Sequence, residues 1–345
     1  TADATVNGVT VGKGANSGSE NTAVGANALD AITTGSPNSA FGYNALTDNT
    51  TGQYNTAIGR EALANNTTAS SNTGIGNYAL GANTTGTYNT AVGAYPLDAN
   101  TTGSYNTGLG GGSLGANTTA DNNTAVGYAA LGANTTGTRN TAVGAYALDA
   151  ASTANDNSAF GYNALGANTT GTLNTAFGSK AVDALSTGSN NTGIGAEALT
   201  SATTCDYNTA VGMSALKDAT TASDNNAFGR EALANNTTTN SNCAFGSVAL
   251  FTQTDGGTKN CAFGNQTLYS NTTGDSNCAM GDSALYTNTT GERNIAIGDY
   301  SMGVNTTGNY NVAIGYGALD ANTTGDLNVA IGYNCLTAQN ANSYN

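Results

Sequence analysis

Histidine and tryptophan are absent from the 345-residue sequence, and it contains only 2 prolines and 8 lysine and arginine residues. Without histidine, an imidazole general acid, general base or metal ligand is excluded. The 22 acidic residues give a formal net charge of -14, and the few basic residues form no cluster. We therefore expect no binding to nucleic-acid phosphates or to anionic lipid headgroups.

Long apolar runs are also missing. No run approaches the roughly 20 residues of a membrane-spanning helix, and Thr1 to Thr10 lacks the charged and apolar regions of a secretory signal, so we expect no membrane insertion. With 47 glycines and only 9% charged residues, this composition ordinarily indicates disorder. The reason is that too little apolar surface is available to offset the entropy lost on folding.

A fixed period overturns the interpretation as a disordered chain. The motif Asn-x-Ala/Gly-apolar-Gly occurs 19 times, at steps of 17 residues with a single step of 18. Counting its Asn as position 1, the consensus is Asn-Thr-Ala-Val-Gly-x-x-Ala-Leu-x-Ala-Asn-Thr-Thr-Gly-x-Tyr. The extra residue lies in Thr252 to Lys259, and Asn345 begins a further unit. The motifs begin at Asn21, Asn38, Asn55, Asn72, Asn89, Asn106, Asn123, Asn140, Asn157, Asn174, Asn191, Asn208, Asn225, Asn242, Asn260, Asn277, Asn294, Asn311 and Asn328.

The repeat predicts an all-β fold, because apolar residues do not recur at helical spacing. We expect one strand at positions 1 to 5, a bend at the position-5 Gly and a second short strand around positions 8 and 9. The Asn-Thr-Thr-Gly segment predicts a turn, with its Gly available for a positive φ. Seventeen residues trace about 56 Å, enough for one narrow coil. The predicted fold is an elongated parallel β-solenoid or β-roll, with residues 1–20 as an irregular cap segment and residues 21–345 as an array of 19 coils.

In such a stack each residue lies about 4.8 Å from its equivalent one coil earlier, and 19 coils make a rod of roughly 90 Å. Like residues therefore form ladders. Phe228, Phe245 and Phe263 should be neighbours, and the Asn side chains of positions 1 and 12 should bond to one another at the corners. After Asn328 the array stops in register, which predicts either a longer native chain or end-to-end stacking.

Positions 4 and 9 are the predicted core, because position 4 is always apolar and position 9 is Leu in nearly every unit. Position 3 is always Ala or Gly, although strand alternation places it on the opposite face from position 4. We expect another chain to pack against it; the alternative is crowding by the opposite wall of a flat coil. Candidate core residues are Phe41, Ile58, Val92, Phe228, Phe245, Phe263, Leu46, Leu97 and Leu319, and candidate inter-chain residues are Ala40, Ala57, Ala91, Ala142 and Ala313.

The cysteines and carboxylates carry little chemistry. Cys243, Cys261 and Cys278 share position 2 and should lie in one column as small residues replacing Thr, because parallel side chains disfavour a disulfide. The acids at positions 10 and 16 recur along the array and predict a solvated acidic edge. A glycosidase needs two carboxylates at a controlled separation in one groove, and no single site stands out. We therefore expect no catalytic, cofactor or metal site. These acids are Asp30, Asp98, Asp149, Asp183 and Asp320 at position 10, and Asp121, Asp206, Asp275, Glu292 and Asp326 at position 16.

Asn-Thr-Thr at positions 12 to 14 creates sequons for N-glycosylation, although a turn favours Asn and Thr in any case. The Thr ranks at positions 13 and 14 are a weaker match to a flat ice-binding array, because adjacent residues point to opposite sides. The candidate acceptors are Asn49, Asn66, Asn83, Asn100, Asn117, Asn134, Asn168, Asn236, Asn271, Asn288, Asn305 and Asn322.

Units such as the one that begins Asn89-Thr-Ala-Val-Gly, followed by Ala-Leu or Pro-Leu and Asn-Thr-Thr-Gly, resemble the repeat arrays of bacteriophage tail fibres. The opening Val6 to Gly12 resembles the first segment of those proteins. The short Ala-Val/Ile-Gly strand is similar to the β-roll heads of trimeric autotransporter adhesins. These resemblances imply a homotrimer, an extracellular or virion-surface location, and attachment to surfaces.

We therefore expect a non-enzymatic fibre shaft or adhesin that associates with itself and contacts a cell-surface glycan or protein receptor. One alternative is a self-stacking extracellular filament, with or without N-glycans. Alternatives of another class are a polysaccharide-cleaving tailspike and an ice-binding solenoid.

Overall fold

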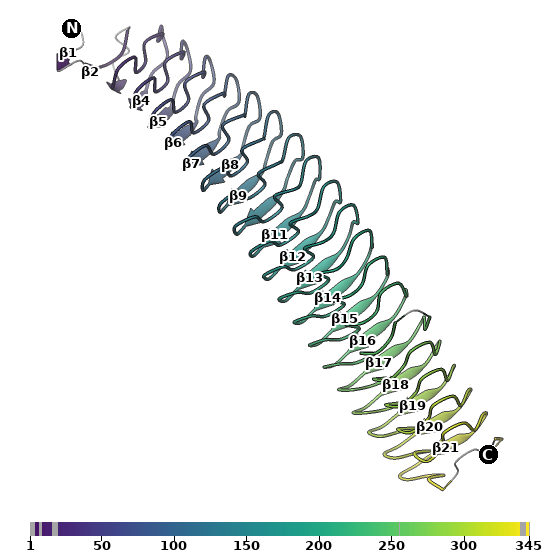
Figure 1. The fold of residues 1–345 in the computed structure, drawn as a ribbon. Coiled ribbons are helices and arrows are strands. Elements are labelled where there is room, and N and C mark those ends of the chain that lie inside the picture. Colours follow the sequence, from purple (N-terminus) through teal and green to yellow (C-terminus); the bar gives the residue numbers. More distant parts are fainter. Residues whose placement is uncertain (1–3, 7–8, 16–19, 255, 339–342, 345) are drawn as a thin grey trace. The chain divides into compact units, whose positions relative to one another are not determined.

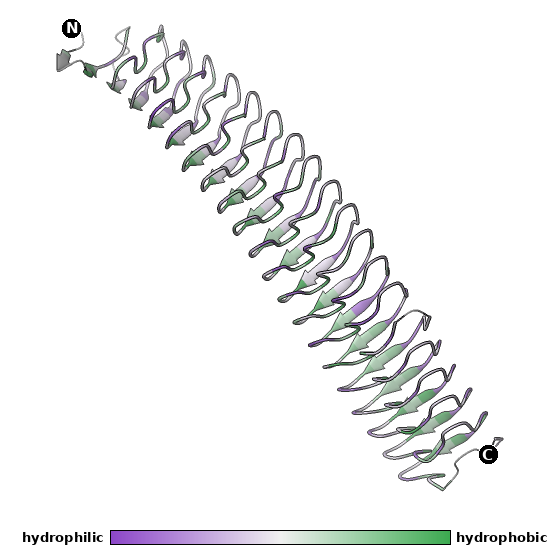
Figure 2. Ribbon diagram, in the orientation of Figure 1, coloured by the Kyte–Doolittle hydropathy of each residue, from purple (hydrophilic) through white to green (hydrophobic). Residues whose placement is uncertain are grey.

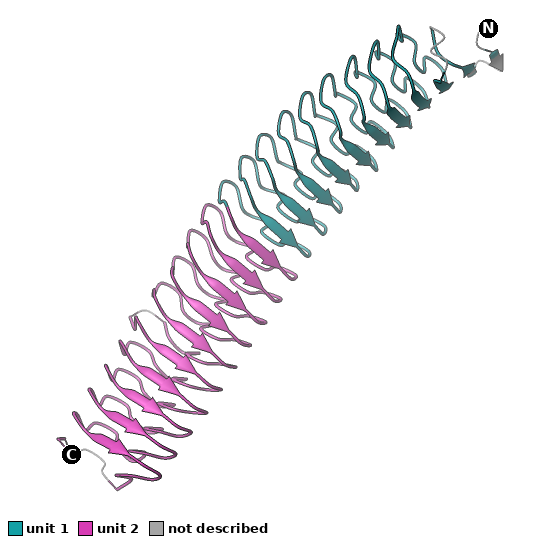
Figure 3. Ribbon diagram, turned by 180° about the vertical axis from the view of Figure 1, so that it is seen from behind, with its two compact units in different colours: residues 1–172 teal, residues 173–345 magenta. Residues whose placement is uncertain are grey.

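The computed structural model describes residues 4–6, 9–15, 20–254, 256–338 and 343–344. These residues form short strands and turns and include no helix, so none of them belongs to a helix that could cross a membrane. The chain divides into two compact units, residues 1–172 and 173–345, which are coloured separately in Figure 3. Parts of the predicted cap segment, and the predicted start of a further coil at Asn345, lie outside the described residues.

The described residues of the first unit form eleven strands, most of them three residues long (Figure 1). From β3 onward each strand pairs in parallel with the next, and every residue partners its equivalent one coil later, as Ala57 does with Gly74. The strands are β1 (Ala4–Val6), β2 (Val9–Gly12), β3 (Thr22–Val24), β4 (Asn38–Phe41), β5 (Asn55–Ile58), β6 (Thr73–Ile75), β7 (Thr90–Val92), β8 (Thr107–Leu109), β9 (Thr124–Val126), β10 (Thr141–Val143) and β11 (Ser158–Phe160).

The second unit repeats this arrangement, again with parallel pairing between successive strands. The strand pairing keeps its register across the 18-residue step, since Cys243 partners Cys261. Both units are therefore parallel β-solenoids of 17-residue coils, as the sequence predicts. The strands are β12 (Thr175–Phe177), β13 (Thr192–Ile194), β14 (Thr209–Val211), β15 (Asn226–Phe228), β16 (Cys243–Phe245), β17 (Cys261–Phe263), β18 (Cys278–Met280), β19 (Ile295–Ile297), β20 (Val312–Ile314) and β21 (Val329–Ile331).

The described part of the cap segment is antiparallel. Strand β1 pairs with β2, and β2 pairs with the first coil strand β3 through Val11 with Val24 and Gly12 with Ala23. The N-terminal edge of β3 is thus hydrogen-bonded to a hairpin. A paired edge does not offer free N–H and C=O groups to another strand.

The prediction of a second strand at positions 8 and 9 is wrong. That segment forms turns, in which the residues at positions 7 and 9 adopt left-handed conformations, as shown by Tyr95 (φ 59°) and Leu97 (φ 52°). Position 17 is left-handed as well, as in Tyr105 (φ 60°). The turn glycine at position 15 is not: Gly103 has no positive φ, contrary to the prediction. A Cβ at Gly103 would instead lie 2.4 Å from Ala120 O in the next coil.

The position-5 glycine is required for two reasons. Gly42 has φ 142°, a conformation that L side chains rarely adopt, and a Cβ there would lie 2.3 Å from Gly59 O in the next coil. The chain bends at this residue directly after each strand, and the bend also brings successive backbones into close contact.

The core lies on the opposite side of each strand from the one predicted. In β7 the central Ala91 is buried, whereas its neighbours Thr90 and Val92 are partly exposed. The alanines therefore point into their own coil, and the alternative of crowding within a flat coil is correct. The predicted inter-chain residues Ala40, Ala57, Ala91, Ala142 and Ala313 are all 0% exposed within the single chain.

Of the two predicted core positions, only position 9 is confirmed. Leu46, Leu97 and Leu319 at position 9 are buried, as predicted. The position-4 residues are not core: Phe41 is 40% exposed, Ile58 41% and Phe263 37%, and Val92, Phe228 and Phe245 are partly exposed. The physical reason is size, because the Ala of position 3 faces the Leu of position 9 across a space too narrow for a larger side chain. A Cβ at Gly193, for example, would lie 2.5 Å from Val182 Cγ2.

Candidate functional site

Two columns of buried asparagine hold the coils together. At position 1, the Asn38 backbone N–H donates to Asn21 Oδ1 (2.8 Å), and Asn38 Nδ2 donates to Gly52 O (2.9 Å). At position 12, Asn100 Nδ2 donates to both Asn83 Oδ1 and Gly103 O, each at 2.9 Å. These bonds confirm the predicted amide ladders at the corners of the coil.

The same burial contradicts the predicted glycosylation sites. A glycan attached to a position-12 Nδ2 would remove a ladder donor and would need space that the folded coil does not have. All of these side chains are 0% exposed: Asn49, Asn66, Asn83, Asn100, Asn117, Asn134, Asn168, Asn236, Asn271, Asn288, Asn305 and Asn322.

Five further sequons lie outside position 12 and were missed; two of them, at Asn190 and Asn235, are partly exposed, and three lie on the surface. Asn65, Asn122 and Asn265 each precede a Thr by two residues, and all three are exposed. The signal was present in the sequence, because the Asn-x-Thr rule applies to them equally. They lie outside position 12 and do not recur from coil to coil, so the repeat pattern does not point to them.

The position-16 carboxylates form a third ladder instead of a freely solvated edge. Asp121 Oδ1 accepts the Ser104 backbone N–H at 2.6 Å, and Asp326 Oδ1 accepts the Asn309 N–H at 2.7 Å. At position 10, burial raises the pKa of the Asp98 and Asp320 carboxyls. Among the described residues, no group of three or more Cys, Asp and Glu side chains could hold a metal ion.

The three position-2 cysteines do form one column. Cys243 pairs in register with Cys261, and Cys261 with Cys278, and all are free thiols that are partly exposed. Cys205 is different: it is fully buried at position 15, and burial raises the pKa of its thiol to about 11. A thiol with that pKa is almost entirely protonated at neutral pH and is a poor nucleophile.

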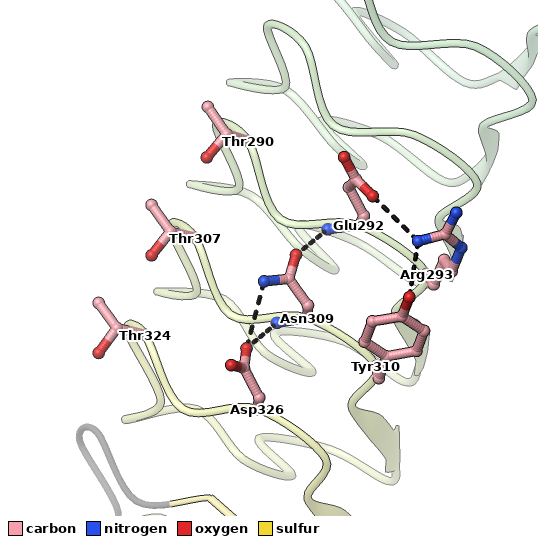
Figure 4. A pocket seen from close by; sticks show the side chains of 8 residues that line it. All are labelled: Thr290, Glu292, Arg293, Thr307, Asn309, Tyr310, Thr324 and Asp326. Carbon is pink, nitrogen blue, oxygen red and sulfur yellow. Dashed lines mark hydrogen bonds and ion pairs between the residues drawn. The ribbon is translucent and has the colours of Figure 1, made fainter.

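The pocket in Figure 4 is a polar depression of about 660 Å³ at the position-14, -16 and -17 edge of the second unit. Its charged groups contact one another. Arg293 Nη1 donates to Glu292 Oε2 (3.1 Å) and to Tyr310 Oη (2.7 Å), and Asn309 Nδ2 donates to Asp326 Oδ1 (3.2 Å). The Arg293–Tyr310 and Asn309–Asp326 contacts join neighbouring coils, whereas Arg293 and Glu292 belong to the same coil. The lining residues are Thr290, Glu292, Arg293, Thr307, Asn309, Tyr310, Thr324 and Asp326.

The most extensive surface feature is the outward side of the strands, which we call the strand face: the side chains at positions 2 and 4 of every coil. None of these side chains is charged. In the first unit, position 2 of this face is Thr or Ser and position 4 is aliphatic or Phe, as in Thr56 and Ile58. In Figure 2 the strands of the first unit are mixed in colour, whereas β16–β21 are mostly green, with β19–β21 strongly so.

The strand face is most apolar at β19–β21, where position 2 also becomes aliphatic. Exposed fractions there are 40% for Ile295, 36% for Ile297 and 36% for Ile314, rising to 54% for Val329 and 66% for Ile331. Earlier in the same unit, Phe228 and Phe245 stack with ring centroids 4.4 Å apart, and Phe245 and Phe263 with centroids 5.0 Å apart. The predicted Phe neighbours are thus confirmed, but on the outer surface.

Comparison of the chain with protein-family models and with curated protein sequences finds no match. The resemblance to fibre repeats therefore rests on the sequence motif and on the solenoid that the motif forms.

Proposed function

We propose that this chain is a non-enzymatic fibre shaft or adhesin, of the kind found in viral tail fibres and surface appendages, and that its copies associate through the strand face. The observation that carries the proposal is the uncharged strand face, with an apolar side chain at position 4 of every coil, on successive strands of each solenoid unit. The repeated coil supports a mechanical role, because the same ladders join every coil to the next.

Covering the strand face would be stabilising, because its apolar side chains are only partly buried in the single chain. Fully burying a Val, Leu, Ile or Phe side chain stabilises by about 1.5–3 kcal/mol. Ile297, Ile314 and Ile331 retain 36%, 36% and 66% exposure, so a covering partner would recover a substantial share at each coil. Monomeric proteins rarely expose a contiguous apolar patch above about 300–600 Å².

A second copy of this chain is the occupant that fits. Its own strand face offers the same uncharged ranks at the same inter-strand spacing of about 4.8 Å, so side chains of the two copies meet in a constant pattern. Burying this face also keeps the acidic groups, which give the net charge of -14, away from the contact. The motif resemblance adds the number of copies, a trimer, and an extracellular or virion-surface location.

Sedimentation-velocity ultracentrifugation of the wild type and two variants tests the association. We expect the wild type to sediment with the mass of three 34.0 kDa chains. Ile314→Glu places a charge on the strand face and should release monomers. Leu327→Glu places it on an exposed side chain (42%) away from the face, at a position where other coils carry Arg or Asp, and should leave the oligomer intact.

A monomeric wild type, or equal dissociation of both variants, would reject the strand-face contact. Circular dichroism of each variant checks that the solenoid is retained. Electron microscopy of the wild type then tests the fibre role. Particles of fixed length are expected for a shaft, whereas filaments of indefinite length would contradict it in favour of a self-stacking filament.

A further inference from the structure

Among the described residues, four pairs of tyrosines stack nearly parallel across neighbouring coils, and in two of these pairs both rings are exposed. In the first unit, the Tyr88 and Tyr105 rings lie with centroids 5.1 Å apart and planes at 3°, and their exposed fractions are 57% and 58%. In the second unit, Tyr316 and Tyr333 stack at 5.4 Å and 12°, with 50% and 76% exposed. Each exposed pair therefore presents two phenols to solvent at a short, fixed separation.

The backbone ladder maintains both separations. Tyr88 N–H donates to Ser70 O (3.3 Å), and Tyr105 N–H donates to Thr87 O (3.0 Å). Both residues have the same left-handed conformation, with φ 58° and 60°. Around the second pair, Asn334 N–H donates to Tyr316 O (2.9 Å). The two rings of a pair thus start from equivalent positions one coil apart and project in the same direction.

We propose that Tyr88–Tyr105 and Tyr316–Tyr333 are sites of oxidative coupling, at which a covalent dityrosine bond joins adjacent coils. The oxidant is external and belongs to the class of one-electron oxidants formed by a haem peroxidase with hydrogen peroxide. This modification goes beyond the fibre role and does not depend on how copies of the chain associate.

Each phenol loses one electron and one proton to the oxidant and becomes a phenoxyl radical with spin density on the ring carbons ortho to oxygen. Two ortho carbons, one from each ring, form a carbon–carbon bond. The hydrogen on each joined carbon then moves to the oxygen of its own ring, restoring both phenols. The net loss is two hydrogen atoms, and one hydrogen peroxide is reduced to two waters.

The short, fixed separation of the two rings favours coupling within one chain. Two groups held side by side react as an intramolecular pair, with an effective concentration far above that of separate molecules. The rings must tilt from their stacked arrangement for the carbons to meet, and their exposure leaves room for that motion. A link between equivalent residues closes a 17-residue loop and would restrict the unfolded chain, as a disulfide does.

To test this proposal, the full chain is treated with horseradish peroxidase and hydrogen peroxide. Dityrosine is then measured by its fluorescence, and the linked residues are identified by mass spectrometry of proteolytic peptides. We expect peptides linked through Tyr88–Tyr105 and Tyr316–Tyr333. The double variant Tyr105→Phe/Tyr333→Phe keeps both stacked rings but lacks one phenol in each pair. Intrachain dityrosine in peptides that contain Tyr88 or Tyr316 should fall at least about fivefold, because the partner phenol is gone, whereas the stacked pairs Tyr78–Tyr95 and Tyr269–Tyr286 keep both phenols.

Tyr54→Phe is the matched control. Tyr54 is 64% exposed at the same coil position as Tyr88, but the residues one coil before and after it are Pro37 and Ser71. Its loss should leave the yield unchanged. Mixing ¹⁴N- and ¹⁵N-labelled chains separates links within a chain from links between chains. Links that are mainly mixed-label, or a yield equally sensitive to Tyr54→Phe, would overturn the proposal.

Discussion

At the scale of single residues, each coil depends on backbone conformations that most side chains avoid. Tyr95, Leu97 and Tyr105 are left-handed, with φ of 59°, 52° and 60°. Such conformations cost roughly 1–2 kcal/mol for an L residue. The neighbouring coil stabilises them, since the Leu97 N–H donates to Ser113 O at 3.0 Å. Strain in one coil is therefore offset by hydrogen bonds to the next.

Position 5 of the coil should not accept a side chain, in contrast to positions 7, 9 and 17, where L residues adopt left-handed conformations. Gly42→Ala introduces a Cβ at φ 142° and 2.3 Å from Gly59 O, so backbone strain and steric overlap add, and we expect a loss of at least about 3 kcal/mol in unfolding free energy. Urea unfolding followed by circular dichroism measures it.

Gly112→Ala is the control for this substitution. Gly112 has φ 65° with nothing within 4 Å of an added Cβ, and Ala129 occupies the equivalent position in the next coil with φ 53°. Its unfolding free energy should fall by about 1–2 kcal/mol, the cost of a left-handed L residue, which is clearly less than the loss expected for Gly42→Ala. Equal losses in the two variants would refute the role of the close approach at Gly42.

At the scale of elements, three-residue strands are too short to be stable by themselves, and side-chain ladders supply the missing contacts. All position-12 asparagines are buried, and most link two coils as well as their own turn, whereas Asn168 and Asn236 bond within their own turns. Removing one leaves buried partners unsatisfied, and an unsatisfied buried group costs about 1–3 kcal/mol. The turns of the solenoid thus stabilise the contact between coils, in addition to the strands.

Adjacent asparagines in one turn allow a direct test. Asn66 Nδ2 donates to Asn49 Oδ1 and Ala69 O, both at 3.0 Å, whereas the Asn65 side chain is exposed. Asn66→Ala should lower the unfolding free energy by about 1–3 kcal/mol, and Asn65→Ala by less than about 0.5 kcal/mol. If thermal and urea unfolding place both variants within error of the wild type, the amide ladder has no stabilising role.

The strand also shows where prediction from sequence reached its limit. Period-2 alternation correctly placed Ala91 and Val92 on opposite faces. It did not say which face is inside, and hydropathy alone favoured Val92. The deciding factor is the space between opposite walls of one coil, where Leu97 already fills the interior and leaves room for only a small residue opposite.

At the scale of the whole molecule, each solenoid unit is a one-dimensional array in which coils contact their neighbours. Stability in such arrays is close to a sum of coil and interface contributions. The coils are also interchangeable in register, because each parallel pairing joins equivalent positions. Removing one complete coil should therefore leave the rest of its unit unchanged.

Deletion of residues 89–105 removes one 17-residue coil and joins Tyr88 to Asn106 in register. We expect the same far-ultraviolet spectrum, with the melting temperature within about 4 °C of the wild type, the shift that 1 kcal/mol produces in a domain of this size. Deletion of residues 89–106 also removes Asn106 and moves the following strand by one position. It should unfold at a clearly lower temperature, and equal melting of the two deletions would disprove the register requirement.

The sequence by itself determined the coil length, the parallel stack, the strand position and the two asparagine ladders. All of these follow from local chemistry repeated at a fixed spacing, since like residues must meet in a stack. The tertiary structure alone decided that the alanines face inward, that the position-4 side chains form an outer face, and that the position-12 sequons are buried. Those outcomes depend on the distance between opposite walls of the coil, which is set by packing and has no counterpart in the order of residues along the chain.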